Sequence, residues 1–127
     1  MTHIPTIKFK DPYNNTYPVR ITHNQKMIYI HRDKGINFTY NRSAIKNLSS
    51  DAYVLYSYLL LNQPERIWAL SSQHVYESTP LKKRTYTKAI QELLEKGYLT
   101  AAEFIDQDNN KHQENTYHFW EDPSLSF

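Results

Sequence analysis

The segment from Lys82 to Gly97 constrains the fold of this chain more than any other. Apolar side chains recur in it at intervals of three and four residues, which predicts a helix with one buried face. They are Tyr86, Ala89, Ile90, Leu93 and Leu94. Gly97 follows directly, and glycine is favoured there because it closes a helix in a left-handed conformation without strain from a Cβ atom. We therefore expect a helix over 82–95 that docks by its apolar stripe and reverses sharply at Gly97.

The opposite face of this predicted helix is polar and positively charged. It is formed by Lys83, Arg84, Thr87, Lys88 and Gln91. The sequence from Lys82 to Gln91 contains no acidic residue, although residues 51–127 hold eleven acidic residues and seven basic ones. A positive face within an acidic region favours contact with an anion. The alternative interpretation is an ordinary solvated face of lysines and arginines.

The overall composition narrows the class of protein. A length of 127 residues suits one domain with a modest core. The absence of cysteine excludes disulfides and thiolate metal sites. No apolar run approaches the ~20 residues that span a bilayer, and the longest, residues 58–61, is too short and too central for a signal peptide. We therefore expect a cytoplasmic protein with no membrane contact.

The N-terminal part of the sequence predicts strands. Residues 1–18 contain three prolines and are interpreted as an irregular arm. β-Branched and aromatic residues at Val19–Thr22 and Lys26–His31 flank the polar residues 23–25, which predicts a β-hairpin. A further short extended piece is expected at Ile36–Tyr40.

Two helices are expected ahead of the amphipathic one. The helix over Ser50–Asn62 follows suitable N-cap residues, and Pro64 ends it because proline disfavours helix in the preceding residue and donates no N–H. Ser71 and Ser72 cap a second helix over Gln73–Ser78.

A second hairpin is expected after Gly97. Its strands are Tyr98–Ile105 and Thr116–Trp120, and the connecting loop is rich in Asp, Asn and Gln, which tolerate turn backbones. Asp106 and Asp108 in this loop are interpreted as residues that shape the turn rather than as a catalytic pair.

Several stretches together resemble a known family. They are the short helix around Ser43–Ile45, Leu48-Ser49, Trp68-Ala69-Leu70-Ser71, the run from Lys88 to Leu99, and Asn115-Thr116-Tyr117. With the order helix, short strand, helix, turn, helix and hairpin, the chain resembles the winged helix-turn-helix proteins of phages and plasmids, including the N-terminal domains of replisome organisers and replication initiators. The resemblance implies an α+β fold with a winged-helix domain over 36–123. An N-terminal arm and hairpin, residues 1–35, would pack on this domain or dimerise it, and residues 124–127 would form a tail.

The resemblance also implies a DNA-binding role for the amphipathic helix. As a recognition helix it would enter the major groove, with Arg84 as the candidate for a bidentate contact to guanine. Alternatively, Arg84 is an ordinary surface arginine that pairs with Glu77 or Glu92. The other implied contacts to bases or phosphates are Lys82, Lys83, Thr85, Thr87, Lys88 and Gln91 of the helix, Asn110 and Lys111 of a wing over 106–115, and Ser71 and Ser72 at a helix N-terminus.

These features predict a sequence-specific double-stranded DNA-binding protein of a mobile element, acting as a transcription regulator or a replication-initiation accessory. A homodimer would bind a pseudo-palindrome, with the N-terminal hairpin as the candidate dimer element. The alternative is a winged-helix module that binds a protein partner encoded by the host or the element. Acidic residues near the wing favour this alternative; they are Glu103, Asp106, Asp108 and Glu114.

Catalysis, metals and cofactors are not expected. The only glycines are Gly35 and Gly97, so the sequence lacks a Gly-rich phosphate loop. The six histidines show no metal-ligand spacing, and His112 and His118 flank the second turn without a third ligand nearby in the sequence.

Overall fold

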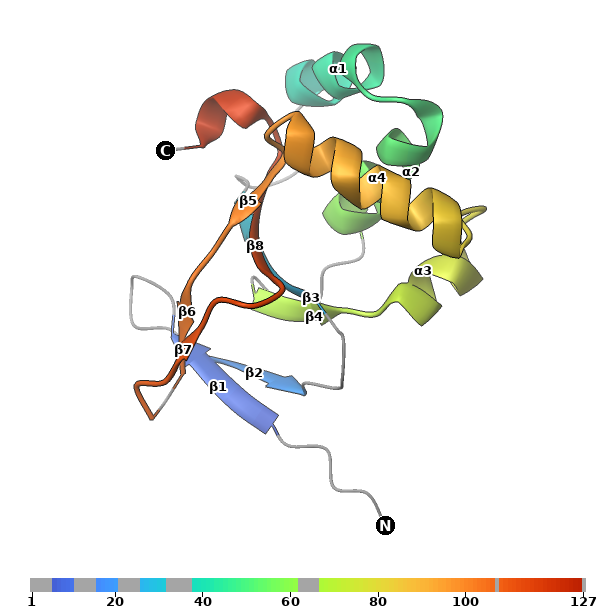
Figure 1. Ribbon diagram of the computed structural model, residues 1–127. Helices are drawn as coiled ribbons and strands as arrows, with labels where there is room; N and C mark the ends of the chain where they lie inside the picture. The colour runs from blue at the N-terminus through green and yellow to red at the C-terminus, as the bar shows by residue number, and fades with distance from the viewer. Residues whose placement is uncertain are drawn as a thin grey trace.

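The computed structural model describes residues 6–10, 16–20, 26–31, 38–61, 67–106 and 108–126. Figure 1 shows how its elements are arranged. They are β1 (Thr6–Lys10), β2 (Thr16–Arg20), β3 (Lys26–His31), α1 (Phe38–Asn47), α2 (Ser50–Leu61), β4 (Ile67–Leu70), α3 (Ser72–Ser78), α4 (Lys83–Glu95), β5 (Leu99–Ala101), β6 (Phe104–Ile105), β7 (Lys111–His112), β8 (Thr116–Trp120) and the 3-10 helix η1 (Pro123–Leu125). The mixed α+β class is confirmed. In the described ranges, no helix has the length and apolar character needed to cross a membrane.

A four-stranded sheet in the order β4-β3-β8-β5 lies at the centre of the structure. β3 is antiparallel to β4 and parallel to β8, and β5 is antiparallel to β8. Residues 27–30 of β3 are all buried, and a continuous apolar run of this kind is typical of a strand covered on both faces. β3 lies in the segment 1–35, but both of its neighbours in the sheet, β4 and β8, belong to the segment 36–123.

The hairpin expected between Val19–Thr22 and Lys26–His31 is wrong. β2 pairs with β1 in a separate antiparallel hairpin, and β3 belongs to the central sheet. Residues 6–10 are thus a strand and not part of an irregular arm, whereas the predicted turn at 23–25 lies outside the described residues. The physical reason is burial: within the central sheet, Ile28 and Ile30 of β3 pack in the core with residues of the helices. Tyr29, on the opposite face, contacts Phe104 of β6 and His118 of β8, and an isolated two-stranded hairpin offers no such cover.

The first two helices match the predictions unequally. α1 begins at Phe38, so the extended conformation expected for Phe38–Tyr40 is wrong, while Ile36 and Asn37 are not described. The helical conformation is favoured over the extended one because it places Ala44 in the core, where this residue is fully buried. α2 begins at Ser50 as predicted and ends within one residue of the expected position.

The prediction for the end of α4 is confirmed in detail. Gly97 has a φ of +84°, in the left-handed region. The N–H of Gly97 donates to the carbonyl of Leu94 at 3.3 Å, and the N–H of Tyr98 donates to the carbonyl of Leu93 at 2.9 Å. This pair of bonds is the Schellman motif, which satisfies carbonyls at the helix end and turns the chain into β5.

The helices cover one side of the sheet, as Figure 1 shows, and α2 packs against α4. The core between them is dominated by large apolar side chains that are fully buried. They include Leu55, Tyr56, Leu59, Leu93, Leu99 and Phe119. This packing fixes which face of α4 remains outside.

The second hairpin forms after Gly97, but its first strand is interrupted. β5 pairs with β8, and the short strands β6 and β7 pair with each other farther along. At the break, the N–H of Ala102 donates to the carbonyl of Thr116 at 3.0 Å, and Asn115 has a positive φ of 54°. The β6–β7 pair and its loop, residues 104–112, are called the wing tip below. In Figure 1 the wing tip lies beyond β5 and β8, at the other end of the sheet from α4.

Candidate nucleic-acid interface

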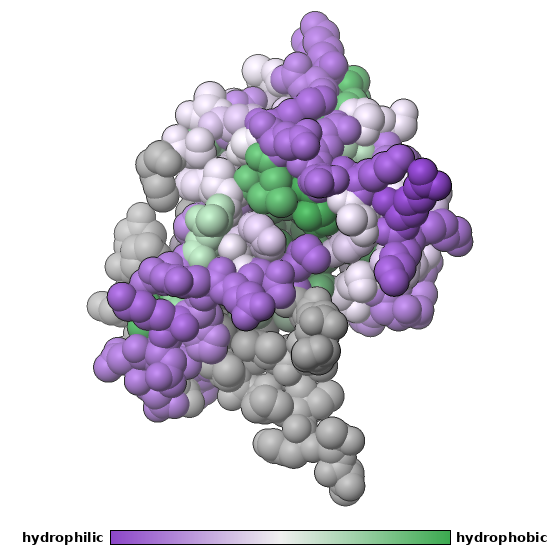
Figure 2. Space-filling model, in the orientation of Figure 1, coloured by the Kyte–Doolittle hydropathy of each residue, from purple (hydrophilic) through white to green (hydrophobic). Residues whose placement is uncertain are grey.

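The outer face of α4 is the main candidate site. Tyr86, Ala89, Ile90 and Leu93 are buried. The opposite arc is exposed, and with the N-cap residue it consists of Lys82, Lys83, Arg84, Thr87, Lys88 and Gln91. Figure 2 shows hydrophilic side chains over this region of the surface. The separation into an apolar face and a cationic face is as predicted, except that Leu94 is 37% exposed and lies at the edge of the buried stripe.

The N-terminal end of α4 accumulates positive charge. Its first turn contains no acidic side chain, and it begins with Lys82 as N-cap followed by Lys83 and Arg84. Cations at this end oppose the helix dipole and cost about 0.3–1 kcal/mol each at an exposed site. Among the described residues, none of the four cations of this face forms an ion pair. Of the two carboxylates considered above as partners of Arg84, Glu77 accepts a hydrogen bond from Gln73, and Glu92 pairs with Lys96. The arrangement is electrostatically suited to hold an anion.

The two threonines of α4 already use their hydroxyl groups within the helix. Thr85 Oγ1 accepts the N–H of Lys82 at 2.8 Å and donates to the carbonyl of Lys82 at 3.1 Å. Because lysine has no acceptor, this is the reciprocal half of a capping box. Thr87 Oγ1 donates to the carbonyl of Lys83 at 2.8 Å. Both hydroxyls therefore hold the helix start and have only acceptor capacity left for a ligand.

The turn between α3 and α4 is fixed by one side chain. Thr79 Oγ1 donates to the carbonyl of Val75 at 2.7 Å and accepts the N–H of Leu81 at 3.1 Å, and Leu81 is buried. Ser71 is the N-cap of α3, because its Oγ accepts the N–H of His74. Ser71 and the exposed Ser72 lie at the other end of α3, about 10 Å along its axis from this turn.

The wing tip is organised by a buried carboxylate. Asp106 Oδ1 accepts the N–H groups of Asp108 and Asn110 at 2.8 and 2.9 Å, and Asp106 Oδ2 lies 2.8 Å from Nε2 of His112. The hydrogen bond with His112, aided by those backbone donors, lowers the pKa of Asp106 to about 2. The interpretation that Asp106 shapes this loop is confirmed. Asn109 adopts a positive φ of 64° within it.

The predicted wing contacts are exposed, but one of them is already paired. Lys111 Nζ lies 3.6 Å from a carboxylate oxygen of Glu103, and Gln113 Nε2 donates to the other oxygen at 2.7 Å. Asn110 is exposed beside them. The carboxylate of Glu103 therefore offsets part of the positive charge that Lys111 would offer to a phosphate.

Sequence reasoning missed one cation beside α4. Lys26, at the start of β3, places its Nζ 5.6 Å from the centre of the Tyr86 ring, and Tyr86 meets Tyr76 edge to face with ring centres 5.7 Å apart. Burial is the main cause of the raised pKa of Tyr86. No local pattern signals this contact, because it exists only once β3 has entered the central sheet.

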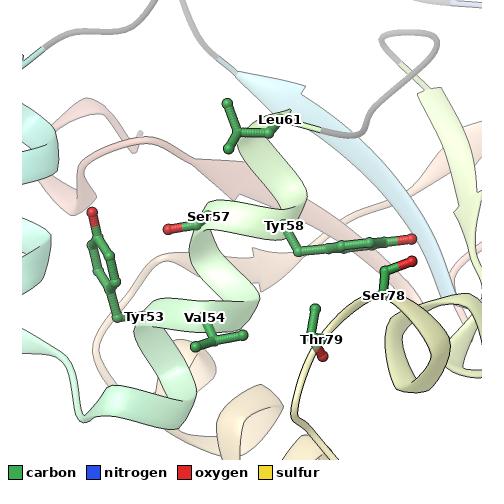
Figure 3. A pocket seen from close by; sticks show the side chains of 7 residues that line it. All are labelled: Tyr53, Val54, Ser57, Tyr58, Leu61, Ser78 and Thr79. Atoms are coloured by element: carbon green, nitrogen blue, oxygen red, sulfur yellow. The ribbon is translucent and has the colours of Figure 1, made fainter.

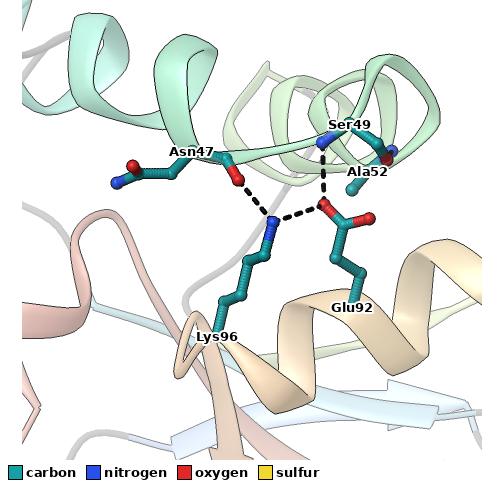
Figure 4. A network of polar contacts seen from close by, with 5 residues as sticks. All are labelled: Asn47, Ser49, Ala52, Glu92 and Lys96. Carbon is teal, nitrogen blue, oxygen red and sulfur yellow. Dashed lines mark hydrogen bonds and ion pairs between the residues drawn. The ribbon is translucent and has the colours of Figure 1, made fainter.

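A second missed feature is the polar network in Figure 4, which joins α4 to the junction between α1 and α2. Glu92 Oε2 accepts the N–H of Ser49 at 2.8 Å and lies 3.3 Å from Lys96 Nζ, and Lys96 Nζ also donates to the carbonyl of Asn47. Arg84 lies about 12 Å from Glu92 along the axis of α4, and the carboxylate of Glu92 is engaged in this network instead.

The chain matches no family model, no curated protein and no solved structure.

Proposed function

We propose that the chain is a winged-helix protein that binds double-stranded DNA sequence-specifically, with α4 in the major groove. The observation that carries the proposal is the exposed face at the start of α4. Lys82, Lys83, Arg84 and Lys88 gather there, with no acidic partner in the described part of the chain. This accumulation has an electrostatic cost that a polyanion would remove. The corresponding biological role is that of a transcription regulator or replication-initiation accessory of a phage or plasmid.

The order of the elements supports a winged-helix interpretation. The elements α2, β4, α3, α4, β5 and β8 follow the order that the resemblance implies, and the β6–β7 pair extends the last hairpin as a wing would. β3 is an addition to that order, because it lies between β4 and β8 in the sheet.

The charge along α4 indicates which part would meet DNA. Cations occupy the first two turns, whereas Glu92 and Glu95 lie near the C-terminal end. A helix of this length spans about 20 Å and is about 10–12 Å wide, which fits a major groove about 12 Å wide. We therefore expect the N-terminal half to enter the groove, with Arg84 at a base edge and the lysines at phosphates.

Selection of bound duplexes from a random pool, followed by salt titration of the preferred duplex, tests this proposal. If all four cations contact phosphates or bases, the slope of log K against log salt should approach about −3.6. Lys83→Ala should weaken binding to all sequences alike and reduce the slope by about one. Arg84→Ala should cost about 1–3 kcal/mol on the preferred site and relax specificity there.

Lys46 provides the matched control, because it is an exposed lysine on α1 rather than α4. Lys46→Ala should bind duplexes as the parent does. If the protein binds no duplex even at low salt, the proposed function is wrong. Equal binding by the parent, Lys83→Ala and Arg84→Ala would show that α4 is not the contact surface.

The charge of the wing favours a second candidate, a winged-helix module that binds a protein. Lys111 is paired with Glu103, and the exposed residues Asp108 and Glu114 add negative charge to the same hairpin. A phosphate backbone would be repelled there, whereas a basic protein surface would be attracted. Failure of duplex selection together with an unchanged fold would favour this candidate.

A further inference from the structure

Lys26 is a cation that β3 brings to the first half of α4. Side chains alternate between the two faces of a strand, and Ile28 and Ile30 of β3 pack in the core with residues of the helices. Lys26 therefore lies on the same face of the sheet, toward α4. Its Nζ is 5.6 Å from the centre of the Tyr86 ring, a distance at which a cation is attracted to an aromatic face.

The Tyr86 ring holds this ammonium group in the neighbourhood of Lys83. Lys83 precedes Tyr86 by three residues, so the two side chains are neighbours on the surface of α4. The ring itself is fixed, because Tyr86 is 5% exposed and meets Tyr76 edge to face. Two cations from distant parts of the chain thus flank one aromatic ring, although like charges repel each other.

Lys26 has no acidic partner in the described part of the chain. Glu114 is the carboxylate to consider, because the adjacent residue, Asn115, accepts the N–H of Met27 through its carbonyl at 2.8 Å. Glu114 is exposed and forms no ion pair among the described residues. Lys26 is itself partly exposed, which leaves its charge available to an anion from outside.

The surface between α2 and the α3–α4 turn offers no such charge. It contains a groove of about 350 Å³, shown in Figure 3, in which Tyr58 points from α2 toward the turn. The groove is lined by Tyr53, Val54, Ser57, Tyr58, Leu61, Ser78 and Thr79, and none of these residues is charged. A phosphate there would lose water without gaining a cation. A polyanion at the start of α4 is therefore favoured on the side of Lys26.

We propose that Lys26 binds a backbone phosphate of DNA beside Lys83, so that β3 forms part of the DNA-binding surface. This proposal rests on the proposed function and adds to it a contact from outside the three helices and the wing. A DNA strand carries closely spaced phosphates, so one strand can meet two lysines that flank the same ring. The ring also restricts the Lys26 side chain in advance, which lowers the entropy lost on binding.

Salt titration with a preferred and an unrelated duplex tests the proposal. With Lys26 as a fifth contact, the slope of log K against log salt should approach about −4.5 for the parent. Lys26→Gln should reduce the slope by about 0.9 and, at about 0.1 M salt, weaken binding to both duplexes by about 8-fold. Both duplexes should be affected alike, because a phosphate contact carries no sequence information.

Two variants control for effects other than the loss of a phosphate contact. Lys26→Arg keeps the charge and the attraction to the ring, and it should bind as the parent does. Lys46→Gln removes an exposed lysine of α1 and should leave the slope unchanged. If the parent binds DNA and Lys26→Gln has the slope of the parent, this proposal is wrong and the proposed function stands. If the parent binds no duplex, both are wrong.

Neutral methylphosphonates, placed one at a time in the preferred duplex, test the position of the contact. The phosphate that Lys26 contacts is the one at which this replacement weakens the parent but not Lys26→Gln. The phosphate of Lys83 is found in the same way with Lys83→Ala. We expect the same phosphate or adjacent phosphates of one strand, because both lysines flank the Tyr86 ring. Phosphates on opposite strands would contradict the proposal.

Discussion

Replacing Glu92 should destabilise the protein by removing a helix cap that one helix supplies to another. Ser49 is the N-cap of α2, and its Oγ accepts the N–H of Ala52 at 3.3 Å. In a capping box, the residue at the position of Ala52 would be Glu or Gln and would accept the N–H of the cap residue. Ala52 is fully buried and cannot do so, and Glu92 of α4 accepts the N–H of Ser49 at 2.8 Å instead (Figure 4).

The expected loss for Glu92→Ala is about 2 kcal/mol of unfolding free energy. A hydrogen bond to a charged group contributes about 1.5–3 kcal/mol, and the side chain of Glu92 is 22% exposed, which favours the lower part of that range. The i, i+4 ion pair with Lys96 adds only about 0.3–0.5 kcal/mol at an exposed position. For a chain of this length, the melting temperature should fall by about 7 °C. Glu92→Gln keeps a neutral acceptor and should lose about 1 kcal/mol.

The stabilising effect of Glu92 should also depend on pH. Partial burial by itself raises the pKa of this carboxyl group, but the hydrogen bonds from Ser49 and Lys96 outweigh burial and lower the pKa below its ordinary value of 4.5. The unfolded chain then takes up the proton at a higher pH than the folded chain. The contribution is therefore fully present above pH 4.5 and is lost as the pH falls through the folded-state pKa.

Urea denaturation followed by circular dichroism measures these differences. The parent, Glu92→Ala and Glu92→Gln should be compared at neutral pH and at a pH below the folded-state pKa of Glu92, where the parent and Glu92→Gln should converge. Glu95→Gln is the control, because Glu95 is an exposed carboxylate of the same helix that shows no ion pair among the described residues. If Glu92→Ala is no less stable than Glu95→Gln at neutral pH, the inter-helix cap contributes nothing and the reasoning is wrong.

Three further substitutions test other parts of the structure. Gly97→Ala should cost about 1–2 kcal/mol in urea denaturation, because its φ of +84° is unfavourable for a residue with a Cβ atom; an unchanged stability would contradict this. Asp106→Asn should speed hydrogen exchange of the Asn110 amide, and the difference from the parent should vanish as the pH falls through the Asp106 pKa of about 2. Tyr56→Phe should lose about 1–2 kcal/mol, because the Tyr56 hydroxyl donates to the buried carbonyl of Glu121 at 2.7 Å, and a smaller loss would mean that water replaces this donor.

Local sequence patterns predicted the parts of the fold that depend on neighbouring residues. The spacing of apolar side chains gave α4 its buried and exposed faces, and Gly97 marked its end because only the local backbone conformation matters there. Leu94 shows the limit of this reasoning. Its spacing in the sequence matches the buried stripe, but it is 37% exposed, because burial at the edge of the stripe depends on which side chains pack beside it.

Contacts between distant segments could not be predicted in this way. The pairing of Lys111 with Glu103 and the position of Lys26 against the Tyr86 ring depend on how strands and helices are brought together. Each of these residues is an ordinary charged residue in the sequence. Only the folded chain shows which charge is already paired and which remains exposed.

The sequence by itself therefore determined the α+β class, the limits of α2 and α4, and the cationic face of α4, because the 3.6-residue repeat and a left-handed glycine are encoded within a few neighbouring residues. The tertiary structure alone decided that β3 pairs with β4 and β8, that Glu92 caps α2, and that the outer side of α2 lines a groove. These outcomes depend on which distant segment buries a given apolar surface most completely, and that choice is made by the whole chain at once.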